Sequence, residues 1–165
     1  MLRRAFVPVV GITALSLVAA ATPPAPARIL KWPPWLSIES PVNPWDPSSR
    51  GVAFYVRAMV RDGIPAVEDL TGIADGFVGG VRRSVPLEFA TTTRPGVFSV
   101  RRSWPTEGAW VVRVSLHATT ALVTLGRDGG VASVRIPTER TPDGVLPRAI
   151  SQREVDSTLA ELAKR

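Results

Sequence analysis

Apolar and polar residues alternate along most of the chain from Val52 onwards. In the segment VAFYVRAMV, every second residue from Val52 to Val60 is apolar, and the residues between them include Tyr55 and Arg57. Successive side chains of a strand point to opposite faces of a sheet, so this segment is expected to be a strand with one face in a core. The same alternation returns in five further runs: 85–89, 98–100, 110–116, 121–125 and 131–136.

These runs, together with a short edge strand expected at 35–40, predict an all-β domain over residues 51–137. About seven short strands separated by turns are typical of an immunoglobulin-like β-sandwich. Trp110 begins the strongest run and is expected to lie in the core with Val112, Val114 and Leu116. The passage through the glycines Gly72, Gly76, Gly79 and Gly80 is interpreted as a long irregular connection.

The pattern changes to a helical period at the end of the chain. Residues 138–150 contain several prolines and are expected to be a loop, and residues 151–165 are expected to form a short amphipathic helix. Ser151 and Glu154 have the spacing of a capping box, and Val155 and Leu159 follow on one face. The narrow apolar stripe favours docking of this helix on its own domain over docking on a partner.

Residues 1–27 have the composition of a secretory signal peptide. A start with Arg3 and Arg4 precedes an uncharged, mostly apolar run, and small residues suitable for cleavage occur before Thr22 and before Arg28. The alternative is an uncleaved membrane anchor, because the uncharged stretch reaches the length of about 20 residues that spans a bilayer. The chain is therefore expected to be exported to the periplasm or the cell exterior, with the membrane contacted only through this segment.

Residues 28–50 are rich in proline and tryptophan and are expected to form a tether that ends in the edge strand. Proline prevents a regular helix or a central strand here. One interpretation of the nearby aromatic residues is an exposed surface that stacks on sugars or docks a peptide, and the other is that they cover an open end of the sandwich. The candidate binding residues are Trp32, Trp35, Trp45 and Trp104.

Composition narrows the classes of function. The chain has no cysteine, which excludes disulfides, thiolate metal sites and thiol nucleophiles, and an exported domain without disulfides is typical of bacteria. The net charge is +6, but Arg3 and Arg4 belong to the expected leader and the other basic residues are scattered. Nucleic-acid binding needs clustered cations, so no nucleic-acid partner is expected.

Several short motifs resemble those of a known bacterial family. They are Asp62-Gly63 after a strand, a glycine-rich middle, Pro95-Gly96-Val97-Phe98 and Gly108-Ala109-Trp110-Val111-Val112. Over roughly residues 52–116 this arrangement resembles the YtkA-like and FixH-like envelope domains. The resemblance implies an immunoglobulin-like fold, and it implies a link to copper or to cytochrome oxidase assembly, as in some members of these families.

The residues needed for chemistry at a metal or a substrate are scarce. His117 is the only histidine, and Met59 is the only methionine beyond Met1, so neither a copper site nor any other cofactor site is expected. No nucleophile elbow of the G-x-S-x-G type occurs, and most acidic residues lie in turns or on strand exteriors. An enzyme is therefore not expected.

Two functional hypotheses follow. The first is a non-catalytic module of the bacterial envelope that acts through contacts with another envelope protein, in an accessory or assembly role. The second is a carbohydrate- or cell-wall-binding module that uses exposed tryptophans. The exposure of the four candidate tryptophans distinguishes the two hypotheses.

Overall fold

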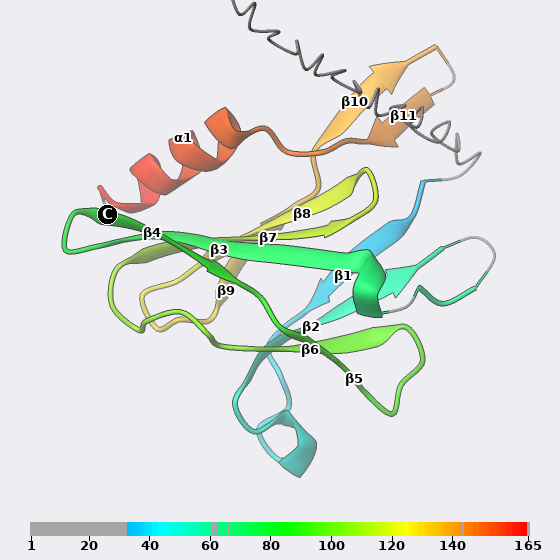
Figure 1. Cartoon of the computed structure of the whole chain (residues 1–165), viewed down its shortest axis with the longest axis horizontal. Coiled ribbons are helices and arrows are strands. Elements are labelled where there is room, and N and C mark those ends of the chain that lie inside the picture. Colours follow the sequence, from blue (N-terminus) through cyan, green and yellow to red (C-terminus); the bar gives the residue numbers. More distant parts are fainter. Residues whose placement is uncertain (1–32, 61–62, 66, 143, 165) are drawn as a thin grey trace, which may run out of the picture.

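The computed structural model describes residues 33–60, 63–65, 67–142 and 144–164, and most of its strands form two packed antiparallel sheets (Figure 1). The first sheet contains, in spatial order, β1 (Trp35–Glu39), β2 (Val52–Met59), β6 (Val97–Arg101) and β5 (Phe89–Thr91). The second contains β4 (Val81–Pro86), β3 (Leu70–Val78), β7 (Ala109–Leu116), β8 (Thr119–Leu125) and β9 (Val131–Arg135). The expected signal peptide and Trp32 lie outside the described residues.

The strand order is that of an immunoglobulin-like sandwich. In such domains the strands A, B, E and D form one sheet, and C, F and G form the other, with an additional strand C′ next to C in some members. The order β1-β2-β6-β5 matches the first sheet, and β4-β3-β7-β8 matches the second. The predicted fold class is confirmed, although the sheets hold four and five strands instead of about seven in total.

The core lies between the two sheets, where the predicted alternation places it. Phe54 and Val56 of β2 are buried against Trp110, Val112 and Leu116 of β7. The indole Nε1 of Trp110 donates a hydrogen bond to the carbonyl oxygen of Glu107 at 2.8 Å, so the ring is buried without an unsatisfied donor. The prediction of Trp110 as a core residue is confirmed.

The glycine-rich passage is a central strand, so its interpretation as an irregular connection is wrong. β3 pairs with both β4 and β7, and Gly76 lies opposite Trp110 in the register. A Cβ atom on Gly76 would lie 2.4 Å from the Trp110 ring, and one on Gly72 would lie 2.6 Å from Leu87. Glycine occurs here because two large side chains, Trp110 of β7 and Leu87 of the connection after β4, pack directly over the backbone of β3, and close approach of other groups is an accepted reason for glycine within a strand.

A second correction concerns residues 138–150, which were expected to be a loop. They contain a separate two-stranded sheet, β10 (Thr138–Thr141) paired with β11 (Gly144–Pro147). Val145 is 60% exposed and Leu146 is 37% exposed, so these strands bury little apolar surface. This hairpin is held mainly by backbone pairing. Its sequence therefore shows no alternation of core and surface residues from which the strands could be predicted.

The helix α1 (Gln152–Leu162) forms a third layer on the outer face of the five-stranded sheet (Figure 1). The predicted capping box is present, with Ser151 and Glu154 bonding each other's backbone N–H groups. Val155 and Leu159 are fully buried against Val111 and Leu122. The predicted docking of this helix on its own domain is confirmed, and the helix covers Val111, which lies on the face of β7 opposite to Val112.

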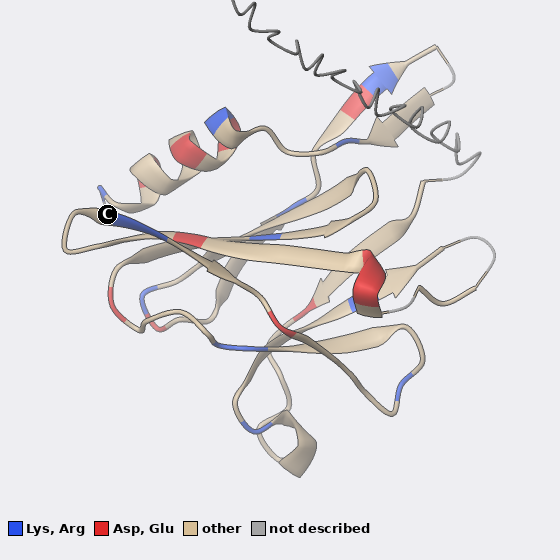
Figure 2. Cartoon of the chain, viewed as in Figure 1, with Lys and Arg blue, Asp and Glu red and all other residues tan. Residues whose placement is uncertain are grey.

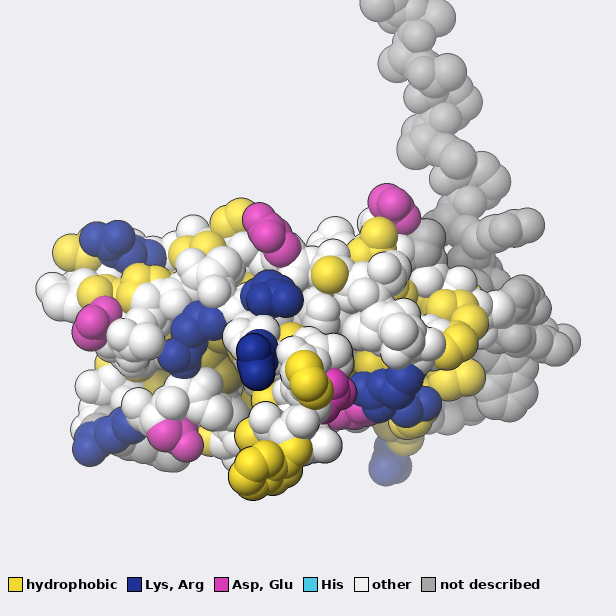
Figure 3. Space-filling view, turned by 90° about the horizontal axis from the view of Figure 1, so that it is seen from below, with side chains coloured by type: hydrophobic (Ala, Val, Ile, Leu, Met, Phe, Trp, Pro, Cys, Tyr) yellow, Lys and Arg dark blue, Asp and Glu magenta, His cyan; other side chains and the backbone are white. Residues whose placement is uncertain are grey.

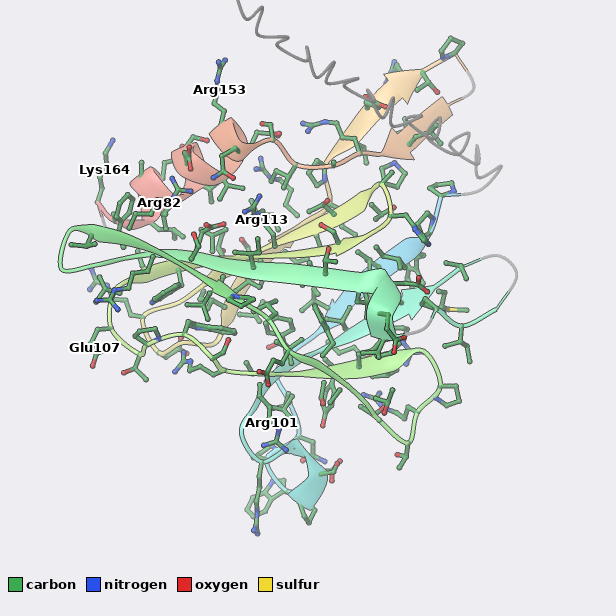
Figure 4. All side chains as sticks on the ribbon, in the orientation of Figure 1. Arg82, Arg101, Glu107, Arg113, Arg153 and Lys164 are labelled. Atoms are coloured by element: carbon green, nitrogen blue, oxygen red, sulfur yellow. The ribbon has the colours of Figure 1, made fainter. Side chains whose placement is uncertain are left out.

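A charged network also holds the helix to the sheet. Asp75 of β3 is 2% exposed and accepts hydrogen bonds from Arg113 at 2.9 Å and from Ser84 at 2.6 Å. Arg82 lies 3.7 Å from Asp75 and 2.7 Å from Asp156 of α1. Figure 4 shows Arg82 and Arg113 between the sheet and the helix. The buried carboxylate is thus paired, and the network links three strands to α1.

Among the described residues, no helix has the length and apolar character needed to cross a membrane.

Candidate functional site

A groove lies on the outer face of the four-stranded sheet. Its volume is about 790 Å³, and it lies between the connection 40–51 and the strands β5 and β6. Its lining includes Glu39, Asn43, Tyr55, Arg94 and Arg101. The molecule is seen from this side in Figure 3, where hydrophobic and arginine side chains lie next to each other.

One wall of the groove is the connection 40–51, called here the Trp45 loop. It joins β1 to β2, contains the short 3-10 helix η1 (Pro47–Ser49), and projects from the bottom of the sandwich in Figure 1. Asp46 caps η1 by accepting bonds from the N–H and the hydroxyl of Ser48, at 2.9 and 2.8 Å. The Ser48 hydroxyl is the first cause of a lowered pKa for Asp46.

The interior of the Trp45 loop is held by hydrogen bonds of its own. The Ser49 hydroxyl is buried and donates to the carbonyl oxygens of Asn43 and Asp46. The Asn43 side chain accepts a bond from the Trp45 N–H at 3.0 Å. These bonds within the loop fix its shape, although the loop extends into solvent.

Trp45 is presented to solvent by this loop, and its side chain is 90% exposed. An indole offers about 150–250 Å² of mostly apolar surface, and leaving that surface in water has an unfavourable free energy. Packing within the domain does not offset this unfavourable free energy, because the ring makes little contact with the rest of the domain. A function that requires the ring accounts for this exposure better than stability does.

The floor and the far wall carry a network of charged side chains. Glu39 accepts hydrogen bonds from Arg57 at 2.9 Å and from Arg94 at 2.8 Å. Partial burial acts to raise the pKa of Glu39, but the bonds from Arg57 and Arg94 outweigh it, so the pKa is lowered. The Arg94 guanidinium also lies 5.1 Å from the centre of the Tyr55 ring and covers it.

Arg101 is the exception among the arginines of the groove. Its Nη1 donates to the carbonyl oxygen of Arg50 at 3.2 Å, at the base of the Trp45 loop. Figure 4 shows the Arg101 side chain directed towards this loop. Among the described residues, neither Arg101 nor Arg50 forms an ion pair with a carboxylate. Asp46 lines the same groove and also forms no ion pair among these residues, so the groove carries unpaired charges of both signs.

The structure does not bring the candidate tryptophans together. Trp35 is 55% exposed, but it lies at the first residue of β1. The Trp45 loop begins at the other end of this strand, after Glu39. Trp104 is 3% exposed, stacked beneath Arg102 with its guanidinium 5.9 Å from the ring centre. The prediction of Trp104 as an exposed binding residue is wrong, because its ring is part of the core. Of the described candidates, only Trp45 lies in the loop that forms a wall of the groove, and its side chain is not part of the lining.

His117 and Met59 do not contribute to a described metal site. His117 lies in the turn between β7 and β8 with a φ angle of 52°, and Met59 is 47% exposed at the end of β2. No group of three or more histidine, cysteine, aspartate and glutamate side chains with metal-binding geometry occurs within the described residues. Basic and acidic residues are interspersed over the sheets and the helix in Figure 2.

The sequence pattern missed Tyr55, Arg94 and Arg101 as site residues. The alternation in β2 places Tyr55 on the outer face, but nothing local indicates that Arg94 and Arg101 lie beside it. They meet because β6 pairs with both β2 and β5. The only indication in the sequence was a polar residue on the outer face of a predicted strand. Many solvated positions without a function have the same feature, so it does not identify a site.

No family model matches this chain, and neither curated proteins nor solved structures give a match. The resemblance of residues 52–116 to the YtkA-like and FixH-like domains stays a prediction.

Proposed function

We propose that this chain is a non-catalytic, exported module of the bacterial envelope that binds another protein through the groove and the Trp45 loop. The observation that carries the proposal is Trp45, 90% exposed on a loop that is closed by its own hydrogen bonds. Tryptophan and arginine are enriched among the residues that dominate the free energy of protein–protein binding. Arg101 lines the groove, and the loop that forms one wall of the groove carries Trp45.

The ordered state of the loop favours binding. Ordering a flexible loop on association lowers the affinity, whereas a loop that is ordered beforehand avoids most of that entropic loss. Transfer of the exposed indole into a partner's pocket would contribute about 4–6 kcal/mol at about 25 cal/mol per Å², before the cost of association. One tryptophan in such a position is sufficient to act as an anchor.

The chemistry of the groove supports contact rather than catalysis. Glu39 is held by two arginines and Asp46 caps a helical turn, so both carboxylates have structural partners. Hydrogen bonds stabilise the ionised form of both carboxylates, and the pKa of each is lowered as a result. A lowered pKa makes a carboxylate a weaker base, and a general base must accept a proton from the reacting group. This supports a role in recognition.

The glycan hypothesis has less support. Sugar binding by stacking needs free aromatic faces, but Tyr55 is covered by Arg94, Trp104 is buried and Trp35 lies at the other end of β1. Among the described tryptophans, only Trp45 lies in the loop that forms a wall of the groove. A single aromatic face is more consistent with an anchor for a protein.

Two matched variants test this proposal. Tagged full-length chains are expressed in the source organism as wild type, Trp45→Ala and Trp35→Ala, and the proteins captured after mild crosslinking are quantified by mass spectrometry. We expect at least one envelope protein that is captured by the wild type and by Trp35→Ala, and is reduced about tenfold or more by Trp45→Ala. Capture that is equal for all three chains would contradict the proposal.

A further inference from the structure

Exposed hydrophobic side chains gather at the end of the sandwich where β1 begins. Trp35 and Met59 are directly paired in the register of β1 and β2, and both are exposed. Their neighbours Leu36 and Ala58 are fully buried, so Trp35 and Met59 lie on the outer face of the four-stranded sheet. The Thr119 hydroxyl at the start of β8 donates to the Pro34 carbonyl oxygen at 2.8 Å, so the turn between β7 and β8 lies at this end as well.

The hairpin of β10 and β11 belongs to the same end. Ala149 and Ile150, which follow β11, line a small pocket together with His117 and Thr120 at the turn between β7 and β8. The hairpin and the start of β1 lie on the right-hand side of Figure 1, away from the C-terminus, and hydrophobic side chains gather on this side in Figure 3. The exposed hydrophobic residues of the two regions are together called the apolar end: Trp35, Met59, Val145 and Leu146.

The sequence that precedes the described residues indicates what this end faces. Residues 5–27 are uncharged and mostly apolar, and their length is sufficient to span a bilayer, which takes about 20 residues. The described chain begins at Pro33, two residues before Trp35. Residues 28–32 extend over at most about 20 Å in any conformation. A chain that is anchored by residues 5–27 therefore holds the start of β1 close to the membrane.

We propose that residues 1–27 stay on the chain as a membrane anchor and that the apolar end rests on the surface of the lipid bilayer. Tryptophan is enriched at the boundary between lipid and water, and exposed apolar side chains bury themselves among the head groups. This adds a second contact to the one expected through residues 1–27. It does not rest on the proposed function, because the Trp45 loop follows the other end of β1 and stays open to a partner.

A bilayer suits the apolar end better than a second protein does. None of its four side chains lines either of the two larger grooves of the described residues, so it offers no deep pocket to a peptide. The charged residues at this end have both signs: Glu68 and Asp69 lie in the short 3-10 helix η2 (Val67–Asp69) before β3, and Glu139 and Arg140 lie on β10. The contact therefore depends on apolar side chains and should form on uncharged lipid.

Single cysteines test the orientation of the domain, because the chain has no cysteine of its own. Full-length chains with Met59→Cys, Val145→Cys or Val134→Cys are synthesised in a cell-free system with phosphatidylcholine vesicles and labelled with an environment-sensitive fluorophore. Val134 is the matched control, because it is an exposed valine on β9 that pairs with Val123 in the middle of β8. Quenching is measured with nitroxide-labelled lipid and with iodide in the water.

We expect the labels at positions 59 and 145 to be quenched by the nitroxide lipid about threefold more than the label at position 134, with the opposite order for iodide. Trp35→Glu in the Val145→Cys chain should remove about half or more of the lipid quenching, since a charge opposes burial among the head groups. Circular dichroism checks that each chain is folded.

Equal quenching at positions 145 and 134, or quenching unchanged by Trp35→Glu, would overturn the inference. Labels at 59 and 145 that are shielded from both quenchers would show that a protein covers this end, and would overturn it too. Mass spectrometry of the envelope fraction of the source organism gives a further test, because recovery of the chain only without residues 1–27 would remove the anchor. None of these results changes the capture expected for Trp45→Ala, so the proposed function fails or stands separately.

Discussion

Trp110 and Gly76 show how a single pair of residues determines the packing of the sandwich. The two residues face each other on neighbouring strands, and the ring occupies the space that a side chain at position 76 would need. The indole is 3% exposed and its N–H is bonded to the Glu107 carbonyl oxygen. The ring therefore fills the core, bonds the turn before β7 and covers the backbone of β3.

Replacement of Trp110 by alanine should lower the free energy of unfolding by about 3–5 kcal/mol, because it leaves a cavity in the core. A domain of this size has a total stability of about 5–15 kcal/mol, so the variant should be close to unfolding. Trp45→Ala is the matched control and should change the stability by less than about 0.5 kcal/mol, since that ring is exposed. Urea unfolding followed by circular dichroism measures both changes, and equal effects of the two substitutions would show that the burial is wrongly assigned.

At the scale of one element, α1 depends on the contacts at its first turn. The Glu154 carboxylate accepts bonds from Arg148 at 2.8 and 2.7 Å and from the Ser151 N–H at 3.0 Å. The bonds from Arg148, followed by those from Ser151, hold the pKa of Glu154 far below its ordinary value of 4.5. A group whose pKa is lowered by folding stabilises the folded state in its ionised form.

The stabilisation by Glu154 should therefore be fully present above pH 4.5 and should disappear as the pH falls through the lowered pKa. A Glu154→Gln variant lacks this ionisation, so its deficit in stability relative to the wild type should shrink between about pH 6 and about pH 3. Glu161→Gln is the control on the same helix, because Glu161 forms no ion pair among the described residues. Thermal unfolding across this range is the measurement, and a deficit for Glu154→Gln that does not vary with pH would refute the assignment.

Elements marked by alternation or by a helix cap in the sequence could be predicted, whereas β3 and the hairpin of β10 and β11 could not. β2 and β7 alternate because one side of each faces the core, and α1 carries a capping box that is visible in the sequence. β3 is crossed by Trp110 and therefore contains glycines where apolar residues were expected. The hairpin of β10 and β11 has little core to mark it.

At the scale of the whole molecule, the groove illustrates why a site is harder to predict than a fold. Trp35, Trp45 and Trp104 all have a proline next to them or one residue away, yet they are 55%, 90% and 3% exposed. Their exposure depends on which strands pack over them and not on their neighbours in sequence. The groove likewise joins Glu39 to residues from β2, β6 and the turn after β5, which are distant along the chain.

The assembled surface leads to one account of the molecule. An immunoglobulin-like sandwich provides a rigid support, α1 closes its second sheet, and the opposite side carries the groove and the Trp45 loop. The loop lies on the side of the molecule away from the helix (Figure 1). A partner bound at the groove would therefore leave α1 and the β10–β11 hairpin uncovered.

Site-specific photo-crosslinking in living cells tests the central claim most directly. A photoreactive phenylalanine analogue is incorporated at position 45 of the full-length chain, or at position 35 as the control, since both side chains are exposed. The account predicts a discrete crosslinked product with one envelope protein from position 45, reduced in an Arg101→Glu background and absent from position 35. No product from position 45, or the same products from both positions, would contradict a binding role for the Trp45 loop.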